Sequence, residues 1–455
     1  MTDIATGDIN YYGKNINTYA AISVNETGKE GVFFGTPEPA PAIETALEDF
    51  EFVIFENNVF KDKKEINTAN QDIPSIVNPT SDEEERPKKC IIKFSVANSI
   101  INDGTFGFDK LPSDYKNLLK SNEQNLLNDI ENLENEYNPF SVEGEQYFPP
   151  WVSIRVGQTI VLNLDKNFTK KDEYQNVAFE NHPDFTFRYM KRPLFSNRPN
   201  EVTDILEANE VHITCTANNE NPDGVLIKVK ADRIDAGAIN VWYPTPKTID
   251  LQWYFVEITG DEKDQDFLES KIDLEKLQDI FEKGLNPTLI NINITNDPAN
   301  IIDISAENAR LKREGILKSS TNHNYIESNL KQRFVDTVRS NHVAQNSIVT
   351  LYLVNRKCLV TGDLGEDGGQ YKVVAGFSPT GTGVAYGILD GEGDLQHTAI
   401  MHEIMHGLGL RHTFSTLATH TFKNKKTKNY MDYSPSKKYT WKWQWTKLHT
   451  YPHLR

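Results

Sequence analysis

Cysteine is scarce in this chain of 455 residues. The three cysteines, Cys90, Cys215 and Cys358, lie far apart in the sequence, and no two of them form a CxxC pair. Any pairing among three thiols would also leave one thiol over. The sequence therefore argues against a disulfide framework.

Targeting and membrane-spanning segments are also missing. The first residues, MTDIATGDINYYGKN, contain neither a basic start nor an apolar stretch, so we expect no ordinary signal peptide. No uncharged apolar run approaches the length of about 20 residues that a spanning helix needs, so we expect no membrane span. If the protein acts outside its cell, a signal-peptide-independent route must export it from the cytoplasm.

Excess positive charge is the third absence. The chain has 48 Lys and Arg residues against 65 Asp and Glu residues, which gives a formal net charge of −17. Binding to a phosphate backbone demands a cationic face, so this balance argues against a nucleic-acid partner. The hydrophobic fraction of 38% and the charged fraction of 25% are those of an ordinary globular protein.

The pattern of apolar residues predicts a multi-domain chain with three regions. Residues 1–87 form a small leading region with strand-like stretches and an acidic linker that ends at 82–87. Residues 88–262 form an all-β, sandwich-like region with one inserted helix at about 113–137. The strand-like runs of this region are 90–96, 151–164, 211–216, 225–230, 238–243 and 248–258. Residues 263–455 form an α+β domain with a mixed, twisted sheet.

The α+β region alternates between helical and strand-like patterns. Leu274, Leu277, Phe281 and Leu285 have helical spacing, and a second helical pattern spans about 324–340. The strand-like runs are 288–294, 348–354 and 383–389. This succession leads directly into the segment 400–414.

Segment 400–414 reads IMHEIMHGLGLRHTF and carries the chemistry of the chain. His402 and His406 are four residues apart, so a helix places both imidazoles on one face, where they can share a metal ion. Glu403 is adjacent and can take a proton from metal-bound water. A continued helix would carry His412 about 9 Å further along the axis and about 240° round it. The chain must therefore leave the helix first, and Gly409 permits the left-handed turn that this requires.

Three neutral imidazoles with one open coordination position are typical of a catalytic zinc site, whereas structural sites usually have four protein ligands. The alternative is a helix with solvent-facing histidines. Against that alternative, the helix is rich in apolar residues and should be buried.

The extended pattern HExxHxxGxxH resembles the metzincin clan of zinc peptidases, which also have a methionine-containing turn beneath the metal. Segment 429–433, NYMDY, matches such a turn, with Met431 as its methionine. Tyr433 matches the position where several metzincin families place a tyrosine near zinc. The resemblance implies that Tyr433 ligates the metal or donates a hydrogen bond to the oxyanion; simple packing is the alternative.

Within the clan, His412-Thr413-Phe414 and the NYMDY turn look most like the pappalysins. The resemblance covers these motifs and, by topology, about residues 265–455. The chain lacks the nearby cysteines and an obvious calcium-binding loop, so calcium has no support in the sequence.

The resemblance implies one catalytic Zn²⁺ with His402, His406 and His412 as ligands and Glu403 as the general base. Met431 and Gly409 would support the site structurally. The substrate would be a protein or peptide that binds as an extended strand at a sheet edge, for which 383–389 is the expected strand. These implications predict a zinc-dependent endopeptidase with a metzincin-like domain.

The final segment, 441–455, resembles the tails that follow similar MDY turns in peptidase-like toxins of bacterial contractile secretion systems. This resemblance predicts an exported bacterial protease effector with a secretion-machinery partner. A final helix that packs Trp441, Trp445 and Leu448 on the core would explain the same residues.

Two other hypotheses follow from the sequence. The protein could instead be a structural or delivery/adhesion component of a secretion system, with a non-catalytic zinc site. A thiolate from Cys90 could also block the zinc and keep the enzyme latent, although a buried small residue is the default for a position in an apolar β run. Four further histidines near the motif are expected not to be ligands: His397, His420, His449 and His453.

Overall fold

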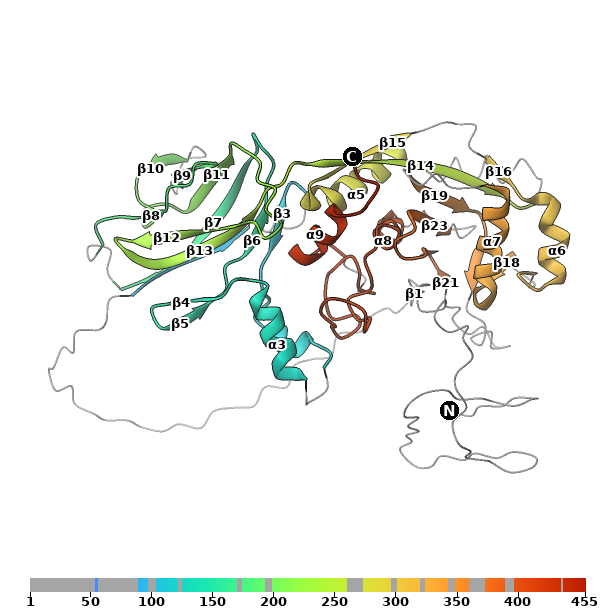
Figure 1. Ribbon diagram of the computed structural model, residues 1–455, viewed down its shortest axis with the longest axis horizontal. Coiled ribbons are helices and arrows are strands. Elements are labelled where there is room, and N and C mark those ends of the chain that lie inside the picture. Colours follow the sequence, from blue (N-terminus) through green and yellow to red (C-terminus); the bar gives the residue numbers. More distant parts are fainter. Residues whose placement is uncertain are drawn as a thin grey trace, which may run out of the picture. The chain divides into compact units, whose positions relative to one another are not determined.

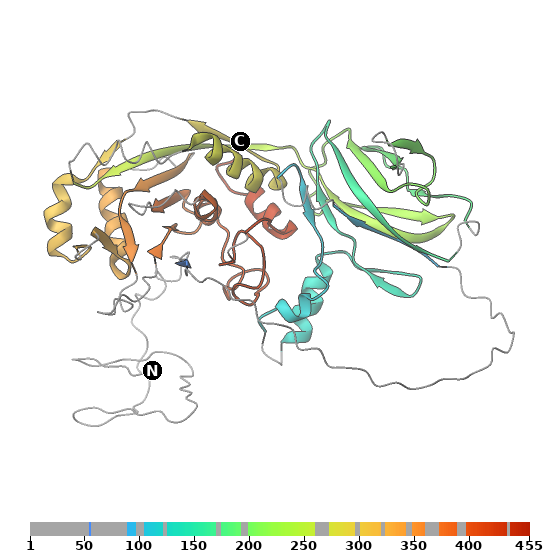
Figure 2. The same cartoon turned by 180° about the vertical axis from the view of Figure 1, so that it is seen from behind.

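The structure of the chain is a computed structural model, shown from two sides in Figures 1 and 2. The residues that it describes are 54–55, 89–96, 104–121, 125–169, 174–192, 199–259, 273–295, 301–319, 324–342, 348–359, 373–388, 397–434 and 437–455. The chain divides into two compact units, 1–50 and 51–455, and every described residue belongs to the second. Most of the expected leading region 1–87, including its acidic linker, lies outside the described residues.

The described part is a mixed α/β structure with several sheets. Two five-stranded sheets, of strand order β10-β9-β11-β7-β2 and β3-β6-β13-β12-β8, share one apolar core. The rings of Phe94 and Phe179, one from each sheet, lie 5.5 Å apart in that core. The strands of the two sheets, with the separate hairpin β4-β5, are β2 (Cys90–Ser95), β3 (Gly107–Asp109), β4 (Phe140–Val142), β5 (Glu145–Tyr147), β6 (Trp151–Ser153), β7 (Thr159–Phe168), β8 (Val177–Phe179), β9 (Phe185–Lys191), β10 (Asn200–Val202), β11 (Glu210–Cys215), β12 (Val225–Ala231) and β13 (Ile234–Trp242).

Each strand-like run expected in this region contains a strand, but the run 151–164 divides into β6 and β7, which belong to different sheets. The run 248–258 becomes β14 (Lys247–Glu257), which pairs with β15, β16 and β19 and not with the preceding sheets. Only four residues separate β14 from β13. The domain boundary expected near 262 therefore lies after a strand that already belongs to the next sheet.

The prediction of a single helix at 113–137 was wrong. The structure has two shorter helices, α2 (Tyr115–Leu118) and α3 (Leu126–Asn135). The chain leaves the helical conformation at Leu119, which forms an antiparallel bridge with Phe422. This pairing joins segments that are distant in the sequence, and a local pattern cannot reveal it.

A parallel sheet forms the centre of the C-terminal region, in the order β15-β14-β19-β23-β22 with β16 also paired to β14. All pairs are parallel except that of β22 with β23. Parallel strands covered on both faces read as continuous apolar runs, and every residue of β19 and β23 is buried. The remaining members are β15 (Ile290–Thr295), β16 (Ile301–Asp303), β19 (Val349–Val354), β22 (Gly376–Phe377) and β23 (Val384–Ile388).

The edge strand differs from the sequence prediction. Residues 383–389 were expected to form the sheet edge, but β23 has β19 on one side and β22 on the other. Within the described residues, the two-residue strand β22 forms that edge and runs antiparallel to the rest. A strand of two residues leaves no periodicity that a sequence reading could detect.

Two helices cover one face of this sheet, and a row of aromatic rings lies on the other. On one face, α5 (Leu274–Leu285) and α8 (His397–Gly407) pack in a common core with Leu351, Leu353 and Ala385. On the other face, one aromatic residue from each of four neighbouring strands forms a continuous row in register: Tyr254, Tyr352, Tyr386 and Phe377. Both faces are thereby filled, which fixes α8 against the sheet.

The remaining elements form a second, smaller sheet and its helices, in the order β1-β21-β20-β18-β17. The helix expected at 324–340 begins only at Lys331, because β18 and a 3₁₀ turn precede it. The elements are β1 (Ile54–Phe55), the 3₁₀ turns η3 (Ser305–Glu307) and η4 (Ser328–Leu330), α6 (Asn308–Arg313), β17 (Leu317–Ser319), β18 (Asn324–Glu327), α7 (Lys331–Asn341), β20 (Lys357–Leu359) and β21 (Val373–Val374). The 3₁₀ turn η2 (Asn286–Thr288) lies elsewhere, between α5 and β15.

The last helix, α9 (Lys442–His449), packs against the sheet β3-β6-β13-β12-β8 as well as against the C-terminal region. The rings of Trp242 and Trp445 lie 6.2 Å apart in a core that both regions share. Asp109 accepts a hydrogen bond from the backbone N–H of Lys442 at 2.9 Å and so caps the first turn of α9. No helix in the described part of the chain is long and apolar enough to span a bilayer.

Candidate metal centre

Helix α8 is buried along almost its whole length and presents His402 and His406 on one face. Its apolar residues, among them Ile400 and Met405, pack into the core beneath the parallel sheet. His402, Glu403 and His406 have no exposed surface, and His412 is 2% exposed. The alternative of a helix with solvent-facing histidines is therefore wrong.

Helix α8 ends in a glycine turn of the kind that the spacing required. Gly409 has φ +99°, in the left-handed region. Its N–H donates to the carbonyl of His406 at 2.8 Å, and the N–H of Leu410 donates to the carbonyl of Met405 at 2.9 Å. These two bonds form a Schellman motif, with Gly409 as the left-handed residue. The turn reverses the chain and returns His412 to the face that carries the other two imidazoles.

The three imidazoles converge on one point. The Nε2 atom of His402 lies 3.0 Å from that of His406 and 3.0 Å from that of His412, and the Nε2 atoms of His406 and His412 are 3.3 Å apart. Three nitrogens at tetrahedral positions around a zinc ion, with bonds of about 2.0–2.1 Å, would be about 3.3 Å apart. The cluster can therefore hold one metal ion.

The other ring nitrogens fix the imidazoles in the tautomer that a metal needs. Nδ1–H of His402 donates to the carbonyl oxygen of Tyr430 at 2.6 Å, and Nδ1–H of His406 donates to that of Leu410 at 2.7 Å. In a neutral ring, Nε2 then carries a lone pair. Lone pairs 3.0 Å apart repel one another unless a cation lies between them. The donor set thus fits a metal ion on chemical grounds.

Burial keeps two of the three imidazoles neutral. It lowers the pKa of His402 and of His412 well below the ordinary value, and the Lys437 ammonium nearby lowers both further. A neutral imidazole is the form that binds metal, so these rings remain available to a metal ion well into the acidic range.

Glu403 lies directly beside the sheet edge. A Cβ atom at Gly376 of β22 would be 2.6 Å from Cγ of Glu403 and 2.8 Å from the carbonyl oxygen of Tyr386. Only glycine therefore fits between this carboxylate and the strand. The edge strand and the carboxylate next to the imidazoles share one small space.

The turn at 429–433 lies against the imidazoles, as expected. Met431 is fully buried in the core with α8, and its backbone oxygen accepts a hydrogen bond from the N–H of Thr413 at 3.0 Å. The half-buried ring of Tyr433 packs edge-on against His412 with centroids 4.5 Å apart, and against Phe414 at 4.8 Å. Tyr433 thus lies beside the cluster, and Met431 lies in the core with α8.

Asp432 organises this turn. Its buried carboxylate accepts hydrogen bonds from the backbone N–H groups of Lys425, Thr427 and Tyr433 at 2.7–2.8 Å, and from the hydroxyl of Thr427 at 2.7 Å. Four donors to one carboxylate hold both ends of the loop together. Asp432 belongs to the sequence motif at 429–433, but the motif alone did not predict a role for its side chain.

Two lysines whose Nζ atoms are buried, Lys331 and Lys437, could not be identified from the sequence. Burial lowers the pKa of Lys331 and of Lys437 to about 8 each, and Glu403 acts on both in the opposite direction. Lys331 begins α7, and its Nζ lies 6.0 Å from the centre of the Phe377 ring on the edge strand. In the sequence both lysines stand in polar surroundings that indicate solvent-exposed side chains, so no local signal could have found them.

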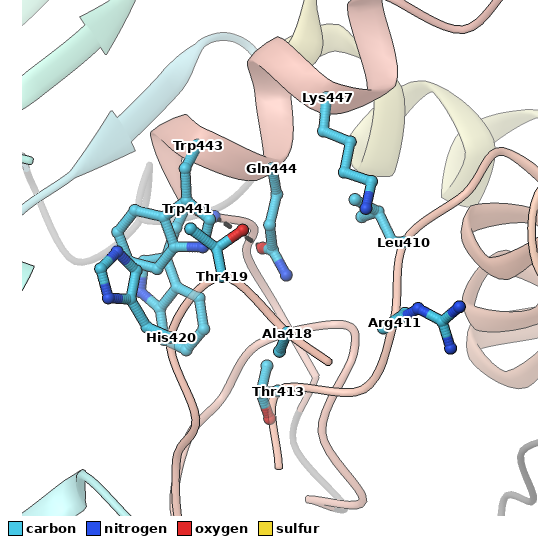
Figure 3. Close-up of a pocket in the computed structure, with 10 residues that line it drawn as sticks. All are labelled: Leu410, Arg411, Thr413, Ala418, Thr419, His420, Trp441, Trp443, Gln444 and Lys447. Atoms are coloured by element: carbon cyan, nitrogen blue, oxygen red, sulfur yellow. Dashed lines mark hydrogen bonds between the residues drawn. The ribbon is translucent and has the colours of Figure 1, made fainter. Parts of the chain in front are cut away.

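A pocket next to the centre is separate from it (Figure 3). Arg411 and Thr413, which flank His412, line this pocket together with residues of α9, but none of the three imidazoles does. Lys447 reaches from α9 towards Arg411; burial and then the Arg411 charge lower its pKa. The pocket therefore lies next to His412 along the chain but is not lined by the cluster.

The remaining histidines and the cysteines lie elsewhere. His420 pairs with Glu136 at 3.1 Å, the Nε2 atom of His449 lies 3.2 Å from the Thr245 carbonyl oxygen, and the ring of His453 packs against Tyr451. His397 is the first residue of α8 and is not part of the cluster. Cys90 is fully buried in the core of the first two sheets, where burial raises its pKa to about 11. This placement argues against a latency mechanism based on its thiolate.

Comparison with known proteins gives no independent assignment. No protein-family model matches the chain, and no curated protein is similar to it in sequence. The function is therefore inferred from the geometry of the centre.

Proposed function

We propose that this protein is a zinc-dependent endopeptidase whose C-terminal domain, which begins with β14, is of metzincin type and follows a sandwich-like region. The observation that carries the proposal is the convergence of His402, His406 and His412 next to a buried glutamate. A structural zinc site has no use for a carboxylate in that place, whereas a hydrolase needs a base.

The residues have distinct roles in this proposal. The three imidazoles would hold the zinc ion, which would supply a Lewis acid that polarises the peptide carbonyl and lowers the pKa of water. Glu403 takes a proton from the attacking water and passes it to the departing amine. The hydroxyl of Tyr433 donates a hydrogen bond to the developing oxyanion. Met431 supports the imidazoles from below.

The edge strand β22 is the proposed docking strand for the peptide. Its outer side carries no strand in the described part of the chain, so an extended peptide can add to the sheet there. Gly376 brings this strand within van der Waals distance of Glu403, so a peptide paired with β22 would pass close to the base.

The test compares proteolysis by the wild type and by Glu403→Gln on unstructured protein and peptide substrates. We expect Glu403→Gln to bind as much zinc as the wild type and to lose on the order of 10²–10⁴-fold in kcat/KM. Glu275→Gln, a change at an exposed glutamate of α5, is the matched control and should keep full activity. Equal activity in the wild type and Glu403→Gln would end the catalytic proposal.

An exported effector role belongs to the proposal but has a narrower basis. It depends on the resemblance of segment 441–455 to the tails of secreted peptidase toxins. The structure accounts for the aromatic residues of this segment by packing, since Trp441, Trp445 and Leu448 are buried in the core. A delivery or adhesion component with a non-catalytic zinc site is the alternative, and the Glu403→Gln comparison separates the two.

A further inference from the structure

Residues 413–423 form a loop that follows the third imidazole, and we call it the His412 loop. Thr413, the first residue of this loop, is buried. Its N–H donates a hydrogen bond to the carbonyl of Met431 at 3.0 Å, and its carbonyl accepts one from the N–H of Phe422 at 2.7 Å. The loop therefore closes on the residue next to His412.

The far side of the His412 loop pairs with the sandwich-like region. Residues 118–120, which we call the bridging segment, lie antiparallel to residues 421–423, with Leu119 opposite Phe422. Two backbone hydrogen bonds, of 2.7 and 2.8 Å, join the two segments on either side of this pair. A continuous series of backbone contacts thus runs from the bridging segment, through the His412 loop, to the turn that contains Met431.

Side chains reinforce this pairing. Leu119 and Phe422 are both buried in the core that α9 shares with the sandwich-like region, and the ring of Phe422 stacks on Trp441 with centroids 4.5 Å apart. A polar contact lies at one side of the bridge, where Nε2 of His420 is 3.1 Å from a carboxylate oxygen of Glu136. The contact between the loop and the sandwich-like region is therefore well packed.

The first two imidazoles are supported differently. His402 and His406 lie on α8, and their Nδ1–H groups donate to the carbonyls of Tyr430 and Leu410. All of these residues belong to the C-terminal region. His412 lies beyond the end of α8, and the residue after it is bonded into the series of contacts with the bridging segment. Because consecutive Cα atoms are held about 3.8 Å apart, a shift of that residue must also move His412.

We propose that the bridging segment positions His412, so that the sandwich-like region completes a metal centre whose other two imidazoles lie on α8. This inference rests on the metal centre of the proposed function and adds the region that controls it. Loss of the bridge releases one side of the His412 loop and leaves a site with two well-held imidazoles, which binds zinc more weakly. The coupling is reciprocal, so bound zinc also strengthens the bridge.

The first test measures the zinc affinity of full-length variants by competition with a chelating dye. Leu119→Ala should bind zinc on the order of 10–100-fold more weakly than the wild type. Leu133→Ala, which truncates a buried leucine of α3 in the same core, is the matched control and should keep the wild-type affinity.

Lys120→Pro is a second variant in case Leu119→Ala does not fold. It removes the N–H that donates to the carbonyl of Thr421 at 2.8 Å, while the side chain that it replaces is exposed. Leu119 already has the extended conformation, with ψ 138°, that a residue before proline adopts. We expect Lys120→Pro to lose as much zinc affinity as Leu119→Ala.

The second test uses the wild type alone and measures amide hydrogen exchange with and without zinc. The backbone amide of Lys120 should exchange about fivefold or more slowly when zinc is bound, because the metal holds His412 and with it the loop. The amides of α3 (Leu126–Asn135) should keep their rates. Equal slowing in both segments would reflect only general stabilisation by a bound ligand and would overturn the inference.

Two other results would also overturn it: zinc affinity in Leu119→Ala and Lys120→Pro equal to that of Leu133→Ala, or an exchange rate at Lys120 that zinc does not change. If neither bridge variant folds, the exchange measurement decides. Failure of the proposed function looks different. In that case the wild type cleaves no peptide, although the bridge variants still bind zinc more weakly than the control.

Discussion

The carbonyl oxygen of Leu410 accepts a hydrogen bond from Nδ1 of His406 at 2.7 Å, across the turn that ends helix α8. The same turn directs the chain from His406 to His412. The backbone that terminates the helix therefore also orients one ligand and delivers another. This relationship links the conformation of a single glycine to the geometry of the centre.

Gly409→Ala tests that link. Alanine at φ +99° costs about 1–2 kcal/mol, and the turn should shift, so that Leu410 and His412 move from their positions. We expect zinc affinity, measured by competition with a chelating dye, to fall on the order of 10–100-fold. Gly157→Ala, at another left-handed glycine with free space around it, should cost similar stability and leave zinc affinity unchanged. Equal zinc affinity in Gly409→Ala and the wild type would refute the link.

Asp432→Ala should destabilise the turn below the centre. The substitution leaves three backbone N–H groups and the Thr427 hydroxyl without their acceptor, which should lower the free energy of unfolding by about 3–5 kcal/mol. Urea denaturation measures this change. Asp279→Ala, at an exposed i,i+4 pair with Lys283, should change stability by less than about 0.5 kcal/mol. A similar effect for both variants would show that Asp432 does not organise the turn.

The sequence predicted the centre better than its surroundings. Spacing alone placed His402, His406 and His412 together and required a left-handed residue between the last two, because helix geometry is local. Pairing between distant segments could not be predicted from local spacing. The bridge of Leu119 with Phe422 interrupts a helical pattern, and the short strand β22 replaces β23 as the edge of the sheet.

Lys437 shows a second limit of sequence reading. A lysine is expected in water, and only the tertiary structure reveals that its Nζ is buried. The burial of the apolar residues of α9, in contrast, was predicted. Packing of a final helix on the core was one of two explanations for the tail 441–455, and the structure confirms this packing.

Asp109 should make the stability of the protein depend on pH. Burial raises the pKa of this carboxyl to about 7, even though the Tyr137 hydroxyl and the Lys442 N–H donate hydrogen bonds to it. Between about pH 4 and 7 the folded state binds a proton that the unfolded state releases. The contribution of Asp109 to the free energy of unfolding therefore falls as the pH rises.

Asp109→Asn removes that contribution. We expect the variant to be less stable than the wild type at pH 5, because one acceptor is lost, and the difference to shrink at pH 7.5. Urea midpoints at the two pH values measure both effects. Parallel pH profiles for the two proteins would mean that Asp109 does not titrate in this range.

Deletion variants should fold only if they retain β14, which lies inside the C-terminal sheet. Removal of residues 1–50 leaves the compact unit 51–455 complete, so we expect an unchanged thermal midpoint and unchanged zinc content. Removal of residues 1–262 takes away β14, the strand between β15 and β19, and should give a chain that does not fold. A folded, soluble product of the longer deletion would contradict the sheet order.

The metal content of the purified protein tests the central claim most directly. Protein expressed in zinc-supplemented medium and freed of loose metal should contain one zinc ion per chain by mass spectrometry. His412→Ala should lose that ion, whereas His453→Ala, a histidine outside the cluster, should retain it. A wild type without zinc, or zinc retained equally by both variants, would contradict the account.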